Sequence, residues 1–109
     1  MISSFWVESV QETVARLVAC GYPTIEQTAR ALGCSPRTLQ RRLHDAGTSY
    51  GEVVDRVRAD AAIRMLEDPS LRLYEIGAAL GFADPSSFSR FFRRIRGVAP
   101  REVRPGRPR

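Results

Sequence analysis

Lysine is absent from this 109-residue sequence, histidine occurs once, at His44, and there are two cysteines, Cys20 and Cys34. A zinc site needs about four Cys or His ligands, so these residues cannot complete one. Clustered carboxylates and a glycine-rich phosphate loop are missing as well. We therefore predict no metal, no cofactor, no catalytic residue and no enzyme activity. We interpret the cysteines as two small buried apolar residues in a reducing compartment.

Long apolar runs are also missing, which limits where the protein can act. No segment approaches the ~20 apolar residues that a membrane span needs. Residues 1–6 lack the basic start and the apolar stretch of a secretory signal. We therefore predict a cytoplasmic protein with no membrane partner. Apolar residues make up 43% of the sequence, enough for one compact domain or two very small lobes.

Positive charge is plentiful but unevenly distributed along the chain. The formal net charge is +5, and all 17 basic residues are arginine. Residues 1–34 and 49–80 carry net negative charge, whereas residues 35–46 and 84–109 carry net charges of +2 and +6. Clustered arginines attract a nucleic-acid backbone, because neutralising phosphates releases bound counterions. A solvated helix face followed by a basic tail is the alternative explanation.

The sequence contains an internal repeat, in which residues 24–47 resemble residues 72–97. The matched pairs are Ala31, Leu32 and Gly33 with Ala79, Leu80 and Gly81, and Pro36, Arg41 and Gly47 with Pro85, Arg90 and Gly97. Each copy predicts a helix, a tight turn and a second helix, because a glycine falls in the turn and a proline begins the second helix. Two such units in tandem are a stronger signal than one.

Capping residues predict where these helices begin and end. Thr24 caps the first helix with Gln27 three positions on, and Gly33 ends it. Ser35 and Asp84 cap the second helix of each copy. The spacing of apolar residues predicts the buried positions, which are Ile25, Ala29, Leu32, Leu39, Leu43 and Ala46 in the first copy and Ile76, Leu80, Phe88, Phe91, Phe92 and Ile95 in the second.

The remaining segments complete a predicted all-α fold of about seven helices. An amphipathic helix over about residues 4–19 precedes the first copy, and a short closing helix is expected at 100–103. A linker helix roughly 28 Å long joins the copies. Its predicted buried stripe is Tyr50, Val53, Val54, Val57, Ala61 and Met65. The predicted organisation is an N-terminal helix-turn-helix lobe at 1–48, the linker helix at 49–67, a C-terminal helix-turn-helix lobe at 68–104 and a basic tail at 105–109.

The polar face of the second helix in the first copy predicts contacts with DNA bases. Arg37, Gln40, Arg41 and His44 share this face, at positions i, i+3, i+4 and i+7. Arginine pairs with guanine and glutamine with adenine, each through two hydrogen bonds in the major groove. We assign the flanking Ser35 and Arg42 to phosphates. A polar face that merely meets solvent is the alternative interpretation.

The equivalent helix of the second copy has shorter side chains on its polar face. Ser86, Ser89 and Arg90 are the predicted base contacts. Arg93, Arg94 and Arg96 are predicted to contact phosphates, which position a protein without specifying sequence. Serine is a permissive base contact, so we expect weaker specificity from this half. The linker helix is long enough to place the two reading helices in successive major grooves, about 34 Å apart, with the DNA bent if necessary.

These residues resemble the DNA-binding domain of the AraC/XylS family of bacterial transcription regulators. The resemblance covers residues 24–104 and is carried by TARALGCSPRTLQRRLHDAGTSY, DRVRADAAIRMLED and IGAALGFADPSSFSRFFRRIRGVAPREVR. It implies two helix-turn-helix lobes on a long helix, binding to double-stranded DNA, and activation of transcription through contact with RNA polymerase. Most members of the family also carry an effector-binding or dimerisation domain, which is missing from this chain. We expect a domain excised from a longer regulator, with a stand-alone member of the family as the alternative.

The resemblance also assigns base-reading positions. They fall on Arg37, Gln40 and Arg41 in the first copy, and on Pro85, Ser86, Ser89 and Arg90 in the second. Pro85 departs from the polar residue frequent in the family, and it has no hydrogen bond to donate. The main alternative function is a helical protein-interaction module without specific DNA binding, which would need an exposed apolar groove. RNA binding is a further alternative, but sheet-borne aromatic residues are absent.

Overall fold

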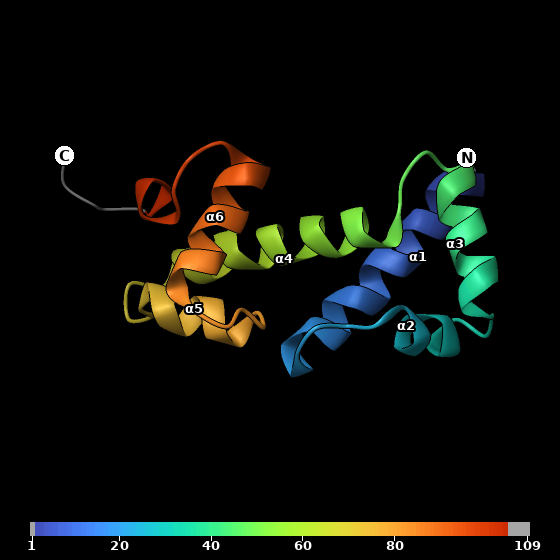
Figure 1. Cartoon of the computed structure of the whole chain (residues 1–109), viewed down its shortest axis with the longest axis horizontal. Helices are drawn as coiled ribbons and strands as arrows, with labels where there is room; N and C mark the ends of the chain where they lie inside the picture. Colours follow the sequence, from blue (N-terminus) through green and yellow to red (C-terminus); the bar gives the residue numbers. More distant parts are fainter. Residues whose placement is uncertain (1, 105–109) are drawn as a thin grey trace. The chain divides into compact units, whose positions relative to one another are not determined.

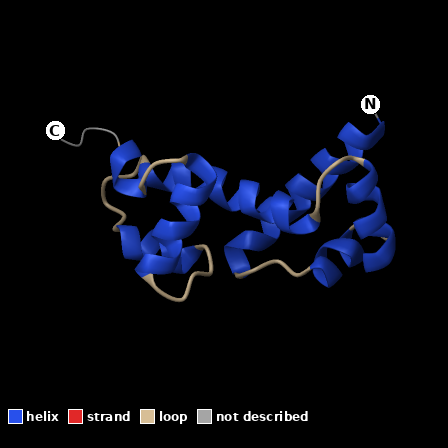
Figure 2. Cartoon of the chain, turned by 45° about the horizontal axis from the view of Figure 1, so that its top comes forward, coloured by secondary structure: helices blue, strands red, loops and turns tan. Residues whose placement is uncertain are grey.

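The computed structural model describes the backbone of residues 2–104 and the side chains of residues 5–104. Within this range all regular structure is helical and no strand occurs (Figure 1, Figure 2). The elements are α1 (Ile2–Leu17), the 3-10 helix η1 (Val18–Cys20), α2 (Ile25–Ala31), α3 (Pro36–Asp45), α4 (Tyr50–Leu66), α5 (Leu73–Ala79), α6 (Pro85–Arg96) and the 3-10 helix η2 (Pro100–Val103). The predicted all-α class is confirmed. The predicted basic tail at 105–109 lies outside the described residues.

The chain divides into two compact units, the first ending at Val57 and the second beginning at Arg58. In unit 1, α1, α2, α3 and the first half of α4 surround one core. That core consists of Val10, Val14, Ala29, Leu39, Leu43, Val53, Val54 and Val57, all buried. The hydroxyl of Tyr50 donates a hydrogen bond of 2.8 Å to the carbonyl of Pro23, which links the start of α4 to the loop before α2. Thr28, which is fully buried, shares a 2.8 Å hydrogen bond with the same hydroxyl.

Unit 2 builds its core from the second half of α4, from α5 and from α6. The buried residues are Ala59, Ala62, Leu66, Ile76, Leu80, Phe88, Phe91 and Phe92. Gly77 allows the close approach of α5 and α6, because a Cβ at this position would lie 3.0 Å from the Cβ of Phe88. Arg104 follows η2 and donates hydrogen bonds to the carbonyls of Leu66 at 3.2 Å and Leu71 at 2.6 Å.

The helix ends follow the local signals in the sequence. Thr24 accepts a hydrogen bond from the Gln27 amide at 3.2 Å, and the Gln27 side chain accepts from the Thr24 amide at 2.9 Å. The side chains of Ser35 and Asp84 cap α3 and α6 by accepting hydrogen bonds from the amides of Thr38 and Ser87. The turn between α2 and α3 passes through Gly33 at φ +74°, in the left-handed region that favours glycine. These predicted caps and turns are confirmed.

The two turns also share a hydrogen bond. The amide of Cys34 donates to the carbonyl of Ala29 at 3.0 Å, and the amide of Phe82 donates to the carbonyl of Gly77 at 2.9 Å. Both bonds close a helix C-terminus across a glycine, as in a Schellman motif. Cys34 and Phe82, the two donors, are 48 residues apart, and so are Ala29 and Gly77, the two acceptors. The repeat therefore extends to individual backbone hydrogen bonds.

The structure extends this repeat to a third helix. Val10, Val14 and Val18 of α1 and η1 are buried, and 48 residues later Arg58, Ala62 and Leu66 of α4 are buried. The helix before each helix-turn-helix therefore packs on it in the same register. The three-helix pattern is α1, α2 and α3 in unit 1 and the second half of α4, α5 and α6 in unit 2.

The predicted buried stripe of the linker helix is wrong in its second half. Ala61 and Met65 are only partly buried, whereas Ala59, Ala62 and Leu66 are almost fully buried. The reason is that α4 contributes to two cores, so no single stripe along the helix describes its burial. The boundaries of this helix, predicted at 49–67, lie within one residue of those observed.

The prediction of two buried cysteines is wrong for Cys20, which is exposed where η1 ends. Cys34 is partly buried against the core of unit 1. The predicted burial of Leu39, Leu43, Phe88 and Phe92 is confirmed. Four further predicted positions are only partly buried, namely Ile25, Leu32, Ala46 and Ile95.

Candidate nucleic-acid interface

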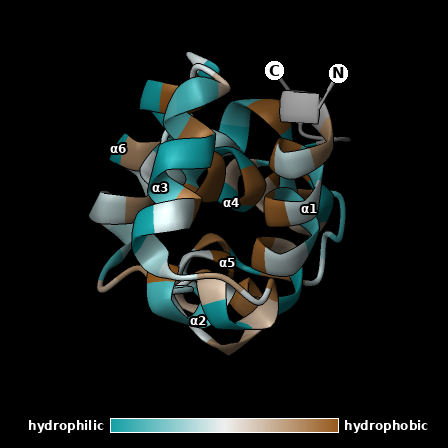
Figure 3. Cartoon of the chain, turned by 90° about the vertical axis from the view of Figure 1, so that its right-hand side faces the viewer, coloured by the Kyte–Doolittle hydropathy of each residue, from teal (hydrophilic) through white to brown (hydrophobic). Residues whose placement is uncertain are grey.

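Helix α3 presents one apolar and one polar face. Leu39 and Leu43 are fully buried in the core of unit 1. The predicted base contacts on the opposite face, Arg37, Gln40, Arg41 and His44, are all exposed. Figure 3 shows α3 as a largely hydrophilic helix. The structure therefore gathers these four side chains on one accessible surface, which we call the α3 face.

Two residues beside the α3 face have partners within unit 1. The Ser35 hydroxyl accepts a hydrogen bond from the Thr38 amide at 3.1 Å, so it serves as the helix cap. The guanidinium of Arg42 lies 4.4 Å from the centre of the Trp6 ring, which belongs to α1. Both residues remain exposed. The contact with Trp6 holds the charge of Arg42 against α1 by a cation–π interaction.

Helix α6 repeats the arrangement with larger apolar residues. Asp84 caps it, Pro85 occupies its first position, and Phe88 and Phe92 are buried. Among the predicted base contacts, Pro85, Ser86 and Arg90 are exposed and Ser89 is partly buried. A guanidinium nitrogen of Arg90 lies 3.4 Å from the Ser87 hydroxyl, to which it donates. These four residues form the α6 face.

The three arginines predicted to contact phosphates lie at the C-terminal end of α6 and are all exposed. The guanidinium of Arg94 lies 5.9 Å from the centre of the Phe91 ring. A nitrogen of Arg96 lies 3.8 Å from a carboxylate oxygen of Asp60 on α4. The Asp60 pairing is exposed, so it is weak and leaves Arg96 available to another anion.

The charge state of the α6 cap has a clear local cause. The Asp84 carboxylate accepts a hydrogen bond from the Ser87 amide at 2.8 Å. This bond holds the pKa of the Asp84 carboxyl below its ordinary value, and the nearby Arg90 acts in the same direction. The Asp84 carboxylate therefore stays ionised at neutral pH. Its negative charge stabilises α6 by interacting with the positive end of the helix dipole.

A hollow of about 400 Å³ lies next to the α3 face and was not expected from the sequence. It is lined by Gln40, His44, Thr48, Ser49, Tyr50 and Gly51. The hydroxyl of Ser49 accepts a hydrogen bond from the Glu52 amide at 3.2 Å and so caps α4. A serine three positions before a glutamate is a common capping pattern, and it coincides with the start predicted for this helix.

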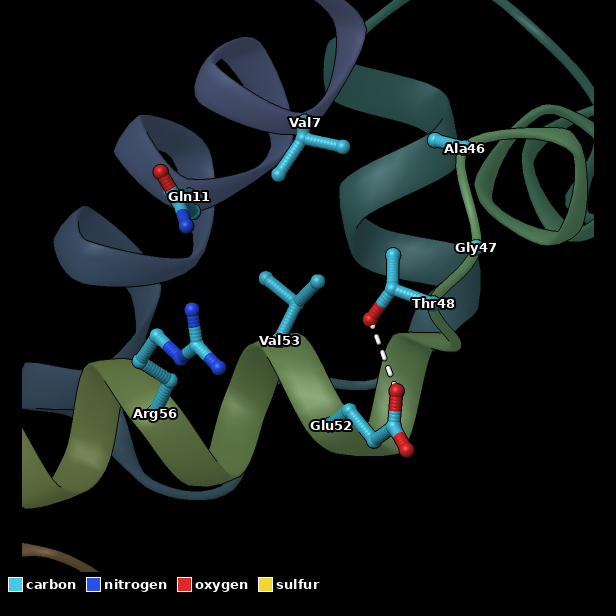
Figure 4. A pocket seen from close by; sticks show the side chains of 8 residues that line it. All are labelled: Val7, Gln11, Ala46, Gly47, Thr48, Glu52, Val53 and Arg56. Carbon is cyan, nitrogen blue, oxygen red and sulfur yellow. Dashed lines mark hydrogen bonds between the residues drawn. The ribbon is translucent and has the colours of Figure 1, made fainter. Parts of the chain in front are cut away.

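A second recess, of about 300 Å³, lies between α1 and α4 (Figure 4). Val7 and Val53 point toward one another across it, with Gln11 and Arg56 on one side. The Thr48 hydroxyl on the other side donates to a Glu52 carboxylate oxygen at 2.9 Å. The recess therefore has an apolar floor and a polar rim.

Within the described residues, no three His, Cys, Asp or Glu side chains gather in a way that could hold a metal ion. No helix in that part of the chain is long and apolar enough to cross a membrane. Every buried side-chain nitrogen or oxygen there has a hydrogen-bond partner. The two candidate surfaces described above are exposed helix faces.

Comparison with known proteins shows which domain family and which proteins this chain is similar to. A helix-turn-helix domain family matches residues 28–106. The ornithine utilization regulator of Pseudomonas aeruginosa is 45% identical over 83 residues, which make up 76% of this chain and 24% of that protein. The chain thus spans about a quarter of the length of the curated relatives it matches.

Solved structures agree with this result. The transcriptional regulator CdpR from Pseudomonas aeruginosa is 47% identical with a TM-score of 0.71, over 76% of this chain and 26% of that chain. A probable AraC family transcriptional regulator from Rhodopseudomonas palustris is 25% identical with a TM-score of 0.76, over 94% of this chain and 98% of that chain.

Proposed function

Because the chain belongs to the AraC/XylS family of helix-turn-helix DNA-binding domains, we propose that it reads specific double-stranded DNA through the α3 face and the α6 face. The observation that carries this proposal is the pair of exposed, arginine-bearing faces, each backed by two fully packed apolar residues, Leu39 with Leu43 and Phe88 with Phe92. A helix held in this way is rigid enough to present donors to base edges in a major groove.

The two faces are proposed to differ in chemistry. On the α3 face, Arg37 and Arg41 read guanine, Gln40 reads adenine and His44 contacts an adjacent base. On the α6 face, Arg90 reads guanine, and Ser86 and Ser89 make permissive contacts. Pro85 contributes only apolar surface, for which the methyl group of thymine is the natural partner.

The phosphate contacts are proposed to position the protein. Arg93 and Arg94 reach the DNA backbone from the end of α6, and Ser35 and Arg42 reach it beside α3. Arg96 exchanges its weak contact with Asp60 for a phosphate. Each neutralised phosphate makes binding more sensitive to salt. It adds about −0.9 to the slope of the logarithm of the association constant against the logarithm of the salt concentration.

We propose further that the two units bind successive major grooves. The repeat supplies one reading helix to each unit, and α4 has 17 residues, which is roughly 26 Å at 1.5 Å per residue. One turn of B-DNA is about 34 Å. The bound sequence should therefore contain two short blocks about ten base pairs apart, and the DNA should bend if the two faces require it.

The wider role is proposed from the family alone. The whole regulator activates transcription through contact with RNA polymerase, and an effector-binding or dimerisation domain belongs to the part of it outside these residues. The matched part of this chain covers only about a quarter of the length of its relatives, which supports the second point. Action on a bacterial chromosome places the protein in the cytoplasm.

Selection of bound sequences from random duplexes tests the proposal. We expect enrichment of two blocks about ten base pairs apart, with the sharper base preference in one of them. Affinity for the selected site should fall steeply between low and physiological salt. Recovery of no preferred sequence would contradict the proposal and favour a protein-interaction role.

A further inference from the structure

Arg58 is a charged residue buried in the core region of unit 2. It lies on α4 with 7% of its surface exposed. Unit 1 places the apolar Val10 at the same register, 48 residues earlier. A buried charge is costly unless it is paired or hydrogen-bonded, so its contacts determine what it does.

These contacts join three parts of the second helix-turn-helix. The Arg58 Nε donates a hydrogen bond of 3.2 Å to the carbonyl of Leu80, the residue that ends α5. The guanidinium carbon lies 3.9 Å from the ring centre of Phe82 in the turn, and 5.3 Å from that of Phe91 on α6. One planar side chain from α4 therefore contacts the end of α5, the turn and the reading helix.

The described residues of unit 1 show no corresponding arrangement at the equivalent positions. At the positions equivalent to Phe82 and Phe91 it has Cys34 and Arg42, and Arg42 stacks instead on Trp6 of α1. An aliphatic side chain such as Val10 packs without preferred direction, whereas a guanidinium that stacks and donates at once accepts few geometries. Unit 2 therefore has a directional contact at a position where unit 1 has a non-directional one.

We propose that Arg58 is a positioning residue for α6. It fixes the angle between α6 and the turn before it, and thereby the geometry in which Ser86, Ser89 and Arg90 meet the DNA. The base preference of the second block thus depends on a side chain that does not touch DNA. This inference rests on the proposed function, because it concerns how the α6 face reads its block.

The test compares two duplexes rather than two affinities. One duplex carries the selected two-block site, and in the other the block read by α6 is scrambled. The ratio of the two dissociation constants measures the preference of α6. A variant that only lowers the fraction of folded protein weakens binding to both duplexes equally and leaves this ratio unchanged.

We expect Arg58→Met to reduce the ratio about tenfold, because the variant loses both the hydrogen bond and the cation–π stack. Arg58→Lys should give an intermediate ratio, since its ammonium can donate to Leu80 but lacks the planar group. Arg64→Met is the matched control. Arg64 lies exposed on the same helix, so this variant removes an equal charge and should leave the ratio unchanged.

Amide hydrogen exchange separates positioning from folding. Amides of α5 and α6 should remain protected in Arg58→Met, and loss of protection confined to these helices would show that Arg58 holds the fold rather than the angle. An unchanged ratio in a folded Arg58→Met would overturn the inference while the proposed function stands. If Arg58→Met does not fold, the Arg58→Lys ratio decides, and a value equal to the parent's overturns the inference. If the parent itself ignores the second block, the proposed two-block function fails, and the inference fails with it.

Discussion

The two units share a plan of three principal helices but fill it differently. In unit 1, Leu39 and Leu43 of α3 share a core with Val10 and Val14 of α1. In unit 2, Phe88 and Phe92 of α6 share a core with Ala62 of α4. Larger buried residues on α6 than on α3 accompany a smaller buried residue on the helix before it, as expected if each core is closely packed. The repeat is therefore one of shape and backbone hydrogen bonds, with few identical residues in the core.

The exposed faces differ as much as the cores. The α3 face carries long side chains with several donors, whereas the α6 face carries serines and one arginine, followed by three more arginines at the helix end. Under the proposed function, unit 1 contributes more of the specificity and unit 2 more of the phosphate-dependent affinity. The following substitutions test this division.

The largest expected effect is on the core of unit 2. Phe92→Ala should destabilise the protein by about 4 kcal/mol, because it leaves a cavity among fully packed aromatic rings. Leu43→Ala, its counterpart in unit 1, should cost about 3 kcal/mol. Chemical denaturation measures both, and hydrogen exchange shows which unit opens. Equal loss of protection across both units in each variant would contradict the independence of the two cores.

The next effect concerns specificity. Arg41→Ala should weaken binding to the selected site by about 1–3 kcal/mol and relax the preference at one base pair, because a two-bonded guanine contact is lost. Arg94→Ala should instead weaken binding to all sequences alike and reduce the salt slope by about 1. Titrations on matched and single-mismatch duplexes at several salt concentrations measure both. If both variants bind the selected site as tightly as the parent, the assignment of the faces is wrong.

A smaller effect is expected at the helix crossing, where unit 1 has Ala29 and unit 2 has Gly77 at the same register. Gly77→Ala should destabilise unit 2 by about 1 kcal/mol, despite the better helix propensity of alanine. Its Cβ would meet that of Phe88, which is buried and cannot easily move. Thermal unfolding measures the change. A more stable variant would mean that α5 and α6 can separate without loss.

The smallest effect distinguishes the two caps. Asp84 has a pKa below its ordinary value in the folded state, so its contribution is present above the unfolded-state pKa and is lost as pH falls through the folded-state pKa. Ser35, the cap of α3, does not titrate. Asp84→Ser should therefore remove an acid-dependent loss of stability confined to pH below about 4. Unfolding followed across pH 2–6 measures it, with Ser35→Ala as the control that should keep the acid dependence.

Local chemistry predicted most of the helix boundaries. Thr24 with Gln27, Ser35 with Pro36, and Asp84 all act over three or four residues, so their roles can be inferred without knowledge of the rest of the chain. The alternation of Leu39 and Leu43 with polar residues likewise predicted which face of α3 is exposed. The hollow beside this face was missed, because it forms between α3 and the start of α4.

Tertiary structure decided the contacts that join separate helices. The burial of Arg58, the stacking of Arg42 on Trp6 and the shift of burial along α4 all depend on which residues lie opposite in space. The pattern of residues along one helix shows which side chains share a face, but it does not show which residues of other helices pack against that face. The sequence thus determined the helices and their exposed faces, whereas only the packed units determined which charged side chains hold those helices in place.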